Sequence, residues 1–165
     1  MAYEETFMRR ALALSRQALD KAGTEPFGAV VVLDGAIVGE GLNHSLAHFD
    51  PTSHSEVEAI RNACHRLQCI DLSGAEMYTS CEPCAMCVAV MEVAGIGRLY
   101  YASSMAQAGD ALAGLTREQR HPVDVDRLRR EAGATVDKRA VPAEQHLDTE
   151  AAAILRTWAG TRKTA

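Results

Sequence analysis

A strand, a helix and a second strand follow one another between residues 76 and 101. Residues 76–80 are a short β-rich run, Pro83 suits the first position of a helix that extends to about Val93, and residues 97–101 are β-rich again. In such a unit the helix crosses over the sheet and the two strands pair in parallel. Parallel strands occur almost only in sheets that helices cover on both faces. This order therefore predicts an α/β fold with helices on both sides of the sheet.

The N-terminal part adds a helix and a hairpin. Apolar residues recur at steps of three to four over residues 3–22, which is the period of an amphipathic helix. Residues 27–33 and 36–41 are β-rich runs, and Asp34-Gly35 between them is typical of a two-residue hairpin turn. We expect an antiparallel strand pair after the first helix.

A second helix is expected after the polar loop that follows the hairpin. Thr52 or Ser53 at the end of that loop can cap a helix running to about Leu67. His54 and Glu56 then stand in the first turn of this helix.

The last third of the chain carries weaker patterns. Residues 103–121 are irregular, residues 124–131 look helical, and residues 134–141 fit a last strand. Residues 143–158 predict a final helix with an apolar stripe at helical period.

Length and composition limit which classes of protein the chain can belong to. At 165 residues, without repeat or linker, the chain predicts one domain over residues 1–165. No apolar run approaches the roughly 18 residues of a membrane span, and the first residues lack a secretory pattern. We therefore expect a cytoplasmic protein that makes no use of a membrane. The net charge of -5 gives no attraction for a polyanion, so nucleic acid is disfavoured as a partner.

Cys84 and Cys87 form the first half of a metal-binding pattern. They are three residues apart on a predicted helix, so both sulfurs lie on one face and can bind one ion. The positive end of the helix favours the thiolate form. Taken alone, the pair also fits a redox motif.

His54 and Glu56 form the second half. A closed structural zinc site needs four protein ligands, and neither Cys64 nor Cys69 offers a second Cys-x-x-Cys pair. With His54 as third ligand, one position stays open for a water molecule, whose pKa zinc lowers toward about 7. Glu56 is placed to act on that water as general base and acid. Together with Pro83 before the first cysteine, the two halves match the His-x-Glu and Pro-Cys-x-x-Cys signature of zinc deaminases.

With these motifs the chain resembles the cytidine and deoxycytidylate deaminase superfamily, and within it the guanine deaminase branch. The resemblance covers roughly residues 25–103 and is carried by residues 25–32, the loop at Asn43, and residues 50–61 and 78–87. It implies a three-layer α/β/α cytidine deaminase-like fold around a five-stranded mixed sheet. It also implies a homodimer in which the part from about residue 143 packs on, or is exchanged with, the partner subunit.

The resemblance also implies the chemistry. His54, Cys84 and Cys87 hold Zn²⁺ at the N-terminal ends of the two motif helices, and Glu56 transfers protons. Water then replaces the exocyclic amine of a free nucleobase, guanine or a related ring, and ammonia leaves.

Four residues are expected to contact the substrate. By position, Asn43 hydrogen-bonds the ring, the Ser55 backbone N–H meets a ring carbonyl, and Phe27 walls the pocket. Each has a structural alternative: Asn43 can shape a turn, Ser55 can simply begin a helix, and Phe27 can belong to the core. Residues 102–116 lack the acidic, aromatic stretch of the guanine branch, and Asp110 is their only acid. Asp110, or Glu118 beyond it, can pair with two N–H groups of a ring edge.

Three alternatives to a guanine deaminase stay open. The small residues after Tyr101 equally fit cytosine-like, isocytosine or aminotriazine rings. A tRNA adenosine deaminase would need Lys and Arg around its site, whereas the residues flanking these motifs are acidic or neutral. A non-catalytic, zinc-stabilised binding module would have no use for Glu56.

Overall fold

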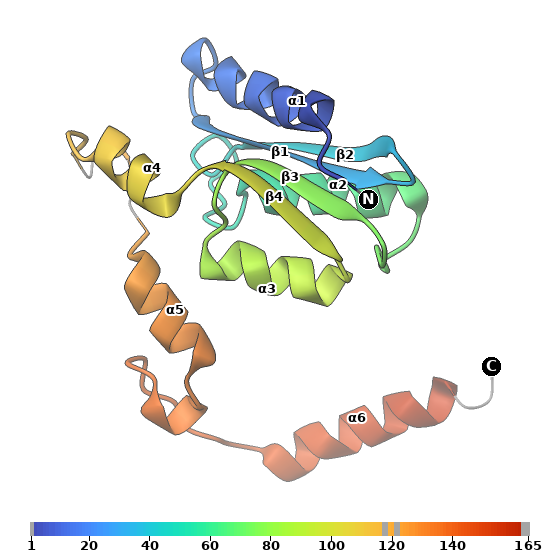
Figure 1. Cartoon of the computed structure of the whole chain (residues 1–165). Helices are drawn as coiled ribbons and strands as arrows, with labels where there is room; N and C mark the ends of the chain where they lie inside the picture. Colours follow the sequence, from blue (N-terminus) through green and yellow to red (C-terminus); the bar gives the residue numbers. More distant parts are fainter. Residues whose placement is uncertain (1, 117–118, 121–122, 163–165) are drawn as a thin grey trace. The chain divides into compact units, whose positions relative to one another are not determined.

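The computed structural model describes residues 2–116, 119–120 and 123–162 (Figure 1). The chain divides into two compact units, Met1–Ala132 and Gly133–Ala165. The first unit contains the sheet and the helices up to α5 (Val125–Gly133), whose last residue falls in the second unit. The second unit contains η2 (Val136–Lys138) and α6 (Asp148–Arg162). Among the described helices, none has both the length and the apolar character that crossing a membrane requires.

The sheet has four strands in the order β2-β1-β3-β4. β1 pairs antiparallel with both β2 and β3, whereas β3 and β4 are parallel. The predicted mixed sheet and its strand–helix–strand unit are therefore confirmed, with α3 as the connecting helix. The bounds are Glu25–Leu33 for β1, Ala36–Asn43 for β2, Glu76–Cys81 for β3, Arg98–Ser103 for β4 and Ala85–Ala94 for α3.

The hairpin turn lies where the sequence predicts it. Asp34 and Gly35 have φ values of 51° and 74°, so both are left-handed. Two left-handed central residues are what a type I′ turn requires, and this turn matches the twist of the two strands.

Helices cover both faces of the sheet (Figure 1). Side chains alternate along β1, so that Val30 and Val32 pack with Met8 and Leu14 of α1, whose bounds are Glu5–Arg16. The intervening Ala29 and Val31 pack with Ala59, Ile60 and Met91 on the opposite face, which α2 (Ser55–Leu67) and α3 cover. The three-layer α/β/α prediction is thus confirmed.

The prediction of a fifth strand is wrong for the described residues. Residues 134–141 contain the short helix η2 (Val136–Lys138) and otherwise irregular backbone. Lys138 donates its backbone N–H to Thr135, and Arg139 Nε donates to the Ala134 carbonyl. These local hydrogen bonds replace the ladder that a strand would need.

Several helices also differ from the sequence prediction. α2 begins at Ser55 with His54 as N-cap, because Ser53 Oγ donates to Glu58 and so does not cap the helix. α3 begins one residue after its N-cap Cys84, which leaves Pro83 ahead of the helix. The stretch expected to be irregular contains α4, and the two later helices are shifted by a few residues: α4 Met105–Leu112, α5 Val125–Gly133 and α6 Asp148–Arg162.

Gly41 sets how closely β2 approaches the start of α2. A Cβ at this position would lie 2.0 Å from the Ser55 carbonyl oxygen and 2.5 Å from the Ala59 nitrogen. Both atoms belong to the backbone, so Gly41→Ala has to displace the helix. We expect a loss of about 1–3 kcal/mol in the free energy of unfolding, measured by urea titration. Gly114→Ala, where no atom lies within 4 Å of the new Cβ, should leave it nearly unchanged; equal stability of the two variants would contradict this account.

Candidate active site

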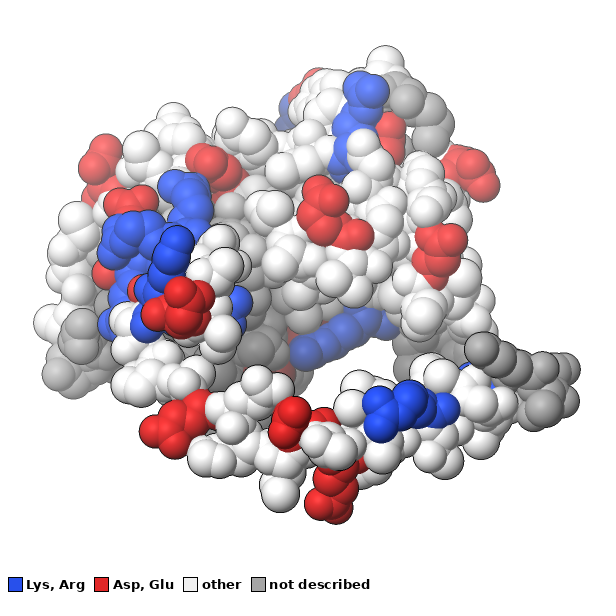
Figure 2. Space-filling view, turned by 90° about the horizontal axis from the view of Figure 1, so that it is seen from below, with Lys and Arg blue, Asp and Glu red and all other residues white. Residues whose placement is uncertain are grey.

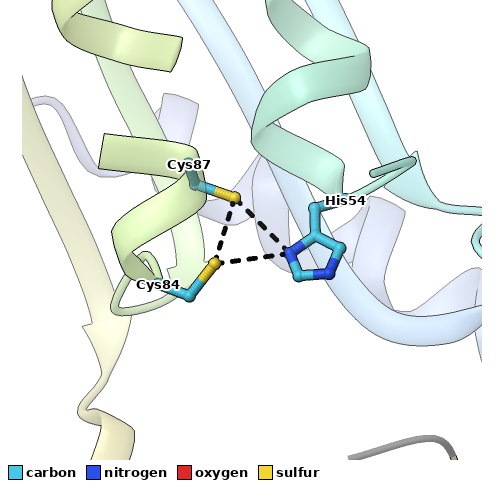
Figure 3. Close-up of side chains that lie close together, drawn as sticks. All are labelled: His54, Cys84 and Cys87. Atoms are coloured by element: carbon cyan, nitrogen blue, oxygen red, sulfur yellow. Dashed lines mark hydrogen bonds between the residues drawn. The ribbon is translucent and has the colours of Figure 1, made fainter. Parts of the chain in front are cut away.

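His54, Cys84 and Cys87 form a triangle of ligating atoms (Figure 3). His54 Nδ1 lies 3.7 Å from Cys84 Sγ and 3.5 Å from Cys87 Sγ, and the two sulfurs are 3.7 Å apart. The histidine comes from the start of α2 and the cysteines from the start of α3. The three residues that the sequence assigned to one ion are therefore together.

The dimensions of this triangle fit zinc. Tetrahedral zinc with Zn–S bonds of about 2.3 Å and a Zn–N bond of about 2.0 Å separates two sulfurs by about 3.8 Å and a sulfur from a nitrogen by about 3.5 Å. The observed separations agree within about 0.2 Å, the tolerance used for metal sites. Two cysteines and one histidine also leave one tetrahedral position for a non-protein ligand.

The local backbone explains why these side chains can bind a metal. His54 and Cys84 are both N-cap residues with extended backbone, and neither side chain caps its own helix. N-cap side chains usually satisfy the first N–H groups of a helix. Here they point to each other instead, and the positive ends of two helices converge on the cluster.

Hydrogen bonding within the triangle sets the charge of the cysteines. The hydrogen bond with Cys87 lowers the pKa of Cys84 to about 4, so that its sulfur is a thiolate at neutral pH. The hydrogen bond with Cys84, together with burial, raises the pKa of Cys87. The hydrogen bond with Cys84 also raises the pKa of His54. One thiolate is therefore already present in the form that metals bind.

Glu56 lies directly beside the triangle. Its Oε2 accepts hydrogen bonds from Ser55 Oγ at 2.9 Å and from the Cys87 thiol at 3.5 Å, and Thr79 Oγ1 lies 3.5 Å from its Oε1. The side chain is buried, and burial raises its pKa. The raised pKa favours the protonated form of this carboxyl group more than in water, and a general acid–base has to use both forms.

A cavity of about 720 Å³ opens onto this cluster. His54, Glu56 and Cys84 form part of its wall, and so do Phe27 and Asn43. Most of the remaining wall is apolar, including Leu46, Phe49, Met105, Leu112, Leu115, Val123 and Val125.

Two predicted substrate residues do not line this cavity. Ser55 is fully buried beneath the cluster, and its hydroxyl is bonded to Glu56. Asp110 is exposed on α4 and is not part of the cavity wall. Glu118 lies outside the described residues. Asn43 lines the cavity and also shapes the loop, because its Oδ1 accepts the Ser45 backbone N–H at 2.9 Å.

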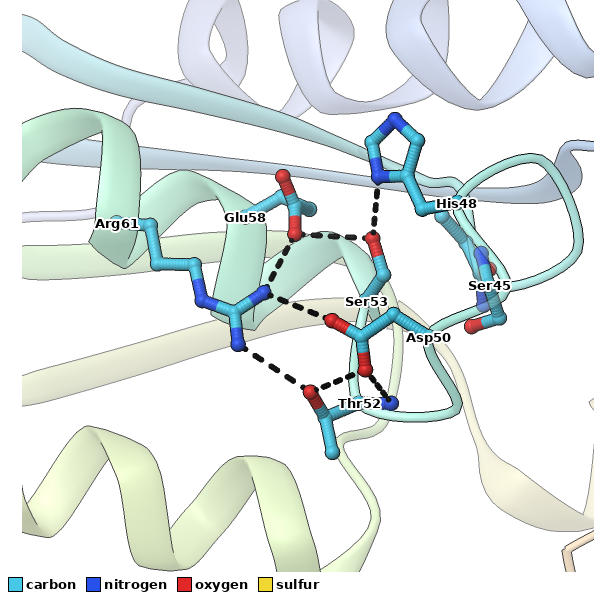
Figure 4. Close-up of polar contacts among 8 residues, drawn as sticks. Ser45, His48, Asp50, Thr52, Ser53, Glu58 and Arg61 are labelled. Atoms are coloured by element: carbon cyan, nitrogen blue, oxygen red, sulfur yellow. Dashed lines mark hydrogen bonds and ion pairs between the residues drawn. The ribbon is translucent and has the colours of Figure 1, made fainter.

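A polar network holds the loop before α2 (Figure 4). Ser53 Oγ donates to Glu58 Oε1 at 2.9 Å, and Arg61 donates to the same Glu58 oxygen at 2.9 Å. Arg61 also lies 3.4 Å from Asp50 Oδ2. These contacts tie the loop to the first two turns of α2 and so fix the backbone at His54.

Sequence reasoning missed Glu25 and Arg120 at the cavity. Both line it, and Arg120 Nε donates to Glu25 Oε2 at 3.1 Å. The two residues are 95 positions apart, so no local pattern joins them. Only the fold brings them together.

Two helix starts that present one histidine and two cysteines, with a buried carboxyl group beside them, define the class of mononuclear metal-dependent deaminases. The chain belongs to the cytidine and deoxycytidylate deaminase family, since the model of the cytidine and deoxycytidylate deaminase zinc-binding region matches residues 1–103. It is therefore a hydrolase that acts on C–N bonds, as the motifs predicted.

Individual relatives include enzymes with different substrates. Guanine deaminase of Bacillus subtilis is 43% identical over 107 residues, which are 65% of this chain and 69% of that protein. The tRNA-specific adenosine deaminase of Agrobacterium fabrum is 38% identical over 115 residues, 70% of this chain and 75% of that protein. The X-ray structure of Bacillus subtilis guanine deaminase matches with a TM-score of 0.80 and 35% identity, covering 96% of this chain and 95% of that chain.

Proposed function

We propose that this protein is a zinc-dependent hydrolytic deaminase of a free nucleobase, guanine or a related amino-substituted ring. The observation that carries the proposal is the triangle of His54, Cys84 and Cys87, with Glu56 in contact with it at the wall of a largely apolar cavity. The similarity to guanine deaminase of Bacillus subtilis over nearly the whole chain supports the choice of ring.

His54, Cys84 and Cys87 would hold the zinc ion. Bound there, zinc would supply a Lewis acid that makes water a better nucleophile at neutral pH and stabilises negative charge on oxygen. Ser55 serves this site through Glu56, because its hydroxyl donates to the carboxyl and fixes its rotamer.

Glu56 carries the proton transfers. It removes a proton from the attacking water while the water oxygen bonds to the ring carbon that bears the amine. It passes this proton to the ring nitrogen. It then takes the second proton from the new hydroxyl group and gives it to the amine, so that the carbonyl forms, the C–N bond breaks and ammonia leaves. Burial suits Glu56 to both tasks, since its raised pKa makes the protonated form accessible.

Asn43 and Phe27 are proposed to bind the ring. Asn43 is nearly fully buried and can present its amide to a ring heteroatom, and Phe27 offers an aromatic surface in the same wall. The backbone N–H of Ser55 has no partner within its own helix, but Ser55 is fully buried and outside the cavity wall, so a contact with a ring carbonyl would require the start of α2 to open toward the cavity. Asp110 would have to act from outside the cavity wall, and we give it no role.

The charges favour a small base over tRNA. Among the described residues of the cavity wall, the only Lys or Arg is Arg120, and its charge is matched by Glu25. On the face shown in Figure 2, basic side chains are interspersed with acidic and uncharged ones. A nucleic-acid site would instead gather basic residues to neutralise phosphates.

Ammonia release from a panel of compounds tests the proposal. The panel is guanine, isocytosine, cytosine, adenine and ammeline, their nucleosides where they exist, and a tRNA anticodon stem-loop. We expect turnover of guanine or another 2-amino-oxo ring. Turnover confined to nucleosides or to the stem-loop would exclude the free-base proposal.

We also propose that the protein is a homodimer in which the C-terminal unit packs on, or is exchanged with, the partner subunit. In the described part of α6, Ile154, Leu155 and Trp158 are each more than half exposed. Apolar side chains in such a group indicate a surface that is covered in an assembly. Light scattering should give twice the chain mass of 17.8 kDa, and Trp158→Glu should shift the protein toward monomer. A monomeric wild type would contradict the proposal.

A further inference from the structure

The cavity wall carries a charged pair that the proposed chemistry does not use. Arg120 Nε donates to Glu25 Oε2 at 3.1 Å, and the guanidinium carbon lies 5.4 Å from the centre of the Phe27 ring. The side chains of Glu25 and Arg120 are 14% and 26% exposed, so water screens their attraction only in part. All three residues line the cavity. The pair therefore belongs to the cavity and not to the solvated surface.

The pair has hydrogen-bonding capacity to spare. Within the described ranges, it makes its hydrogen bond through Nε of Arg120 and Oε2 of Glu25 alone. Glu25 Oε1 is then available as an acceptor, and the two terminal nitrogens of Arg120 as donors. The positive charge of Arg120 and the negative charge of Glu25 cancel. A ligand can therefore bind to their free donors and acceptor although the pair adds no net charge to the apolar wall.

The other carboxyl groups of the described cavity wall already have tasks. Glu82 Oε2 accepts the backbone N–H of Met105 at 2.9 Å and so anchors the start of α4. Glu56 lies beside the metal-ligating triangle. Among the carboxylates of the described cavity wall, Glu25 is therefore the one that can bind the substrate ring.

We propose that Glu25 and Arg120 are the specificity-determining pair of this cavity. Glu25 Oε1 accepts a hydrogen bond from a ring N–H, and Arg120 donates to an acceptor next to it. The ligand class is a free heteroaromatic base that carries an N–H beside a carbonyl oxygen or an unsubstituted ring nitrogen. The inference rests on the proposed function and adds to it which residues recognise the ring by hydrogen bonds. Substitution of the ring N–H removes the donor and leaves a partly buried carboxylate unsatisfied.

Steady-state kinetics of Glu25→Gln on guanine, 1-methylguanine and 9-methylguanine test the pair. The two methylated rings each lack one ring N–H. If Glu25 accepts a hydrogen bond from one of these N–H groups, the ring that lacks it should be a poor substrate for the wild type. We expect Glu25→Gln to lower kcat/KM on guanine by about 10- to 100-fold, mainly through KM. On the methylated ring that lacks the donor, the same variant should change kcat/KM by less than about threefold.

The matched control is Glu40→Gln. Glu40 forms an ion pair with Arg10 at 2.6 Å, away from the described cavity wall, so its variant should leave the ratio among the three rings unchanged. If Glu25→Gln proves unstable to urea, Arg120→Gln takes its place, with the same expected loss of discrimination. An equal loss on all three rings would mean that the pair only ties the segment after α4 to β1, and it would overturn the inference. Unchanged kinetics on guanine would overturn it as well.

Ligand binding separates this inference from the proposed function. If the wild type releases no ammonia from any free base, the proposed function fails, and the pair is then judged by the shift of thermal unfolding with each of the three rings. A shift that is larger for guanine than for one methylated ring, and equal for the two in Glu25→Gln, would support the pair. A shift that the variant does not alter would exclude it.

Discussion

Glu56→Gln should abolish ammonia release without removing the metal. The amide keeps the size of the side chain and can still accept from Ser55 Oγ, but it cannot take a proton from water or pass one to the ring. Loss of general acid–base catalysis lowers kcat by about 10²- to 10⁴-fold, and we expect the upper part of this range because Glu56 serves both proton transfers. Zinc content per chain should stay at the wild-type value, since Glu56 is not part of the triangle.

The measurement pairs single-turnover ammonia release with metal analysis of the same sample. Glu92→Gln is the matched control, because this glutamate is exposed on α3 and touches neither the triangle nor the cavity wall. Retained activity in Glu56→Gln would remove the catalytic assignment and return the site to a structural metal centre. Lost activity together with lost zinc would assign Glu56 to metal binding and not to proton transfer.

Local sequence patterns predicted the centre of the fold well. The continuous β-rich run of β1 and the Asp34-Gly35 turn determine the hairpin through contacts a few residues apart. The spacing of Cys84 and Cys87 depends only on helix geometry, and His54 joins them because two helix starts meet at the same edge of the sheet. These features depend on short stretches of chain, which is why the sequence alone could predict them.

The features that sequence reasoning missed depend on distant contacts or on capping. The capping box of α4 reads Ser104 and Gln107, but Gly109 and a run of small residues hid the helix that it begins. The fifth strand had no pairing partner that the sequence could specify. Glu25 and Arg120 meet only after the segment beyond α4 has returned to β1.

The same separation between local and distant determinants applies to function. The groups that activate water lie within two short motifs, inside the residues 1–103 that the family model matches, and the relatives include both a guanine deaminase and a tRNA-specific adenosine deaminase. The groups that would choose the ring come from β1, the end of β2 and the segment after α4. Reaction type can therefore be predicted from the motifs, whereas substrate choice depends on how the later part of the chain closes the cavity.

Cys87→Ser should remove the metal and a large part of the thermal stability. Cys87 is fully buried and contributes one corner of the triangle, and a hydroxyl is a much weaker zinc ligand than a thiolate. A ligand present at about 1,000 times its Kd stabilises the folded state by about 4 kcal/mol. For a domain of this size that corresponds to about 8–16 °C in Tm. Wild-type protein should show this difference between zinc-loaded and chelator-treated samples, and Cys87→Ser should show little of it.

Cys69→Ser is the control for this experiment, because Cys69 is exposed and lies outside the triangle. It should keep about one zinc per chain and the full difference in Tm between loaded and chelated protein. Cys87→Ser should retain less than about a tenth of the wild-type zinc, since a zinc site that loses one of only three protein ligands loses most of its affinity. A Cys87→Ser protein that kept its zinc and its Tm would show that the ion lies elsewhere, and the proposed chemistry would then have no metal beside Glu56.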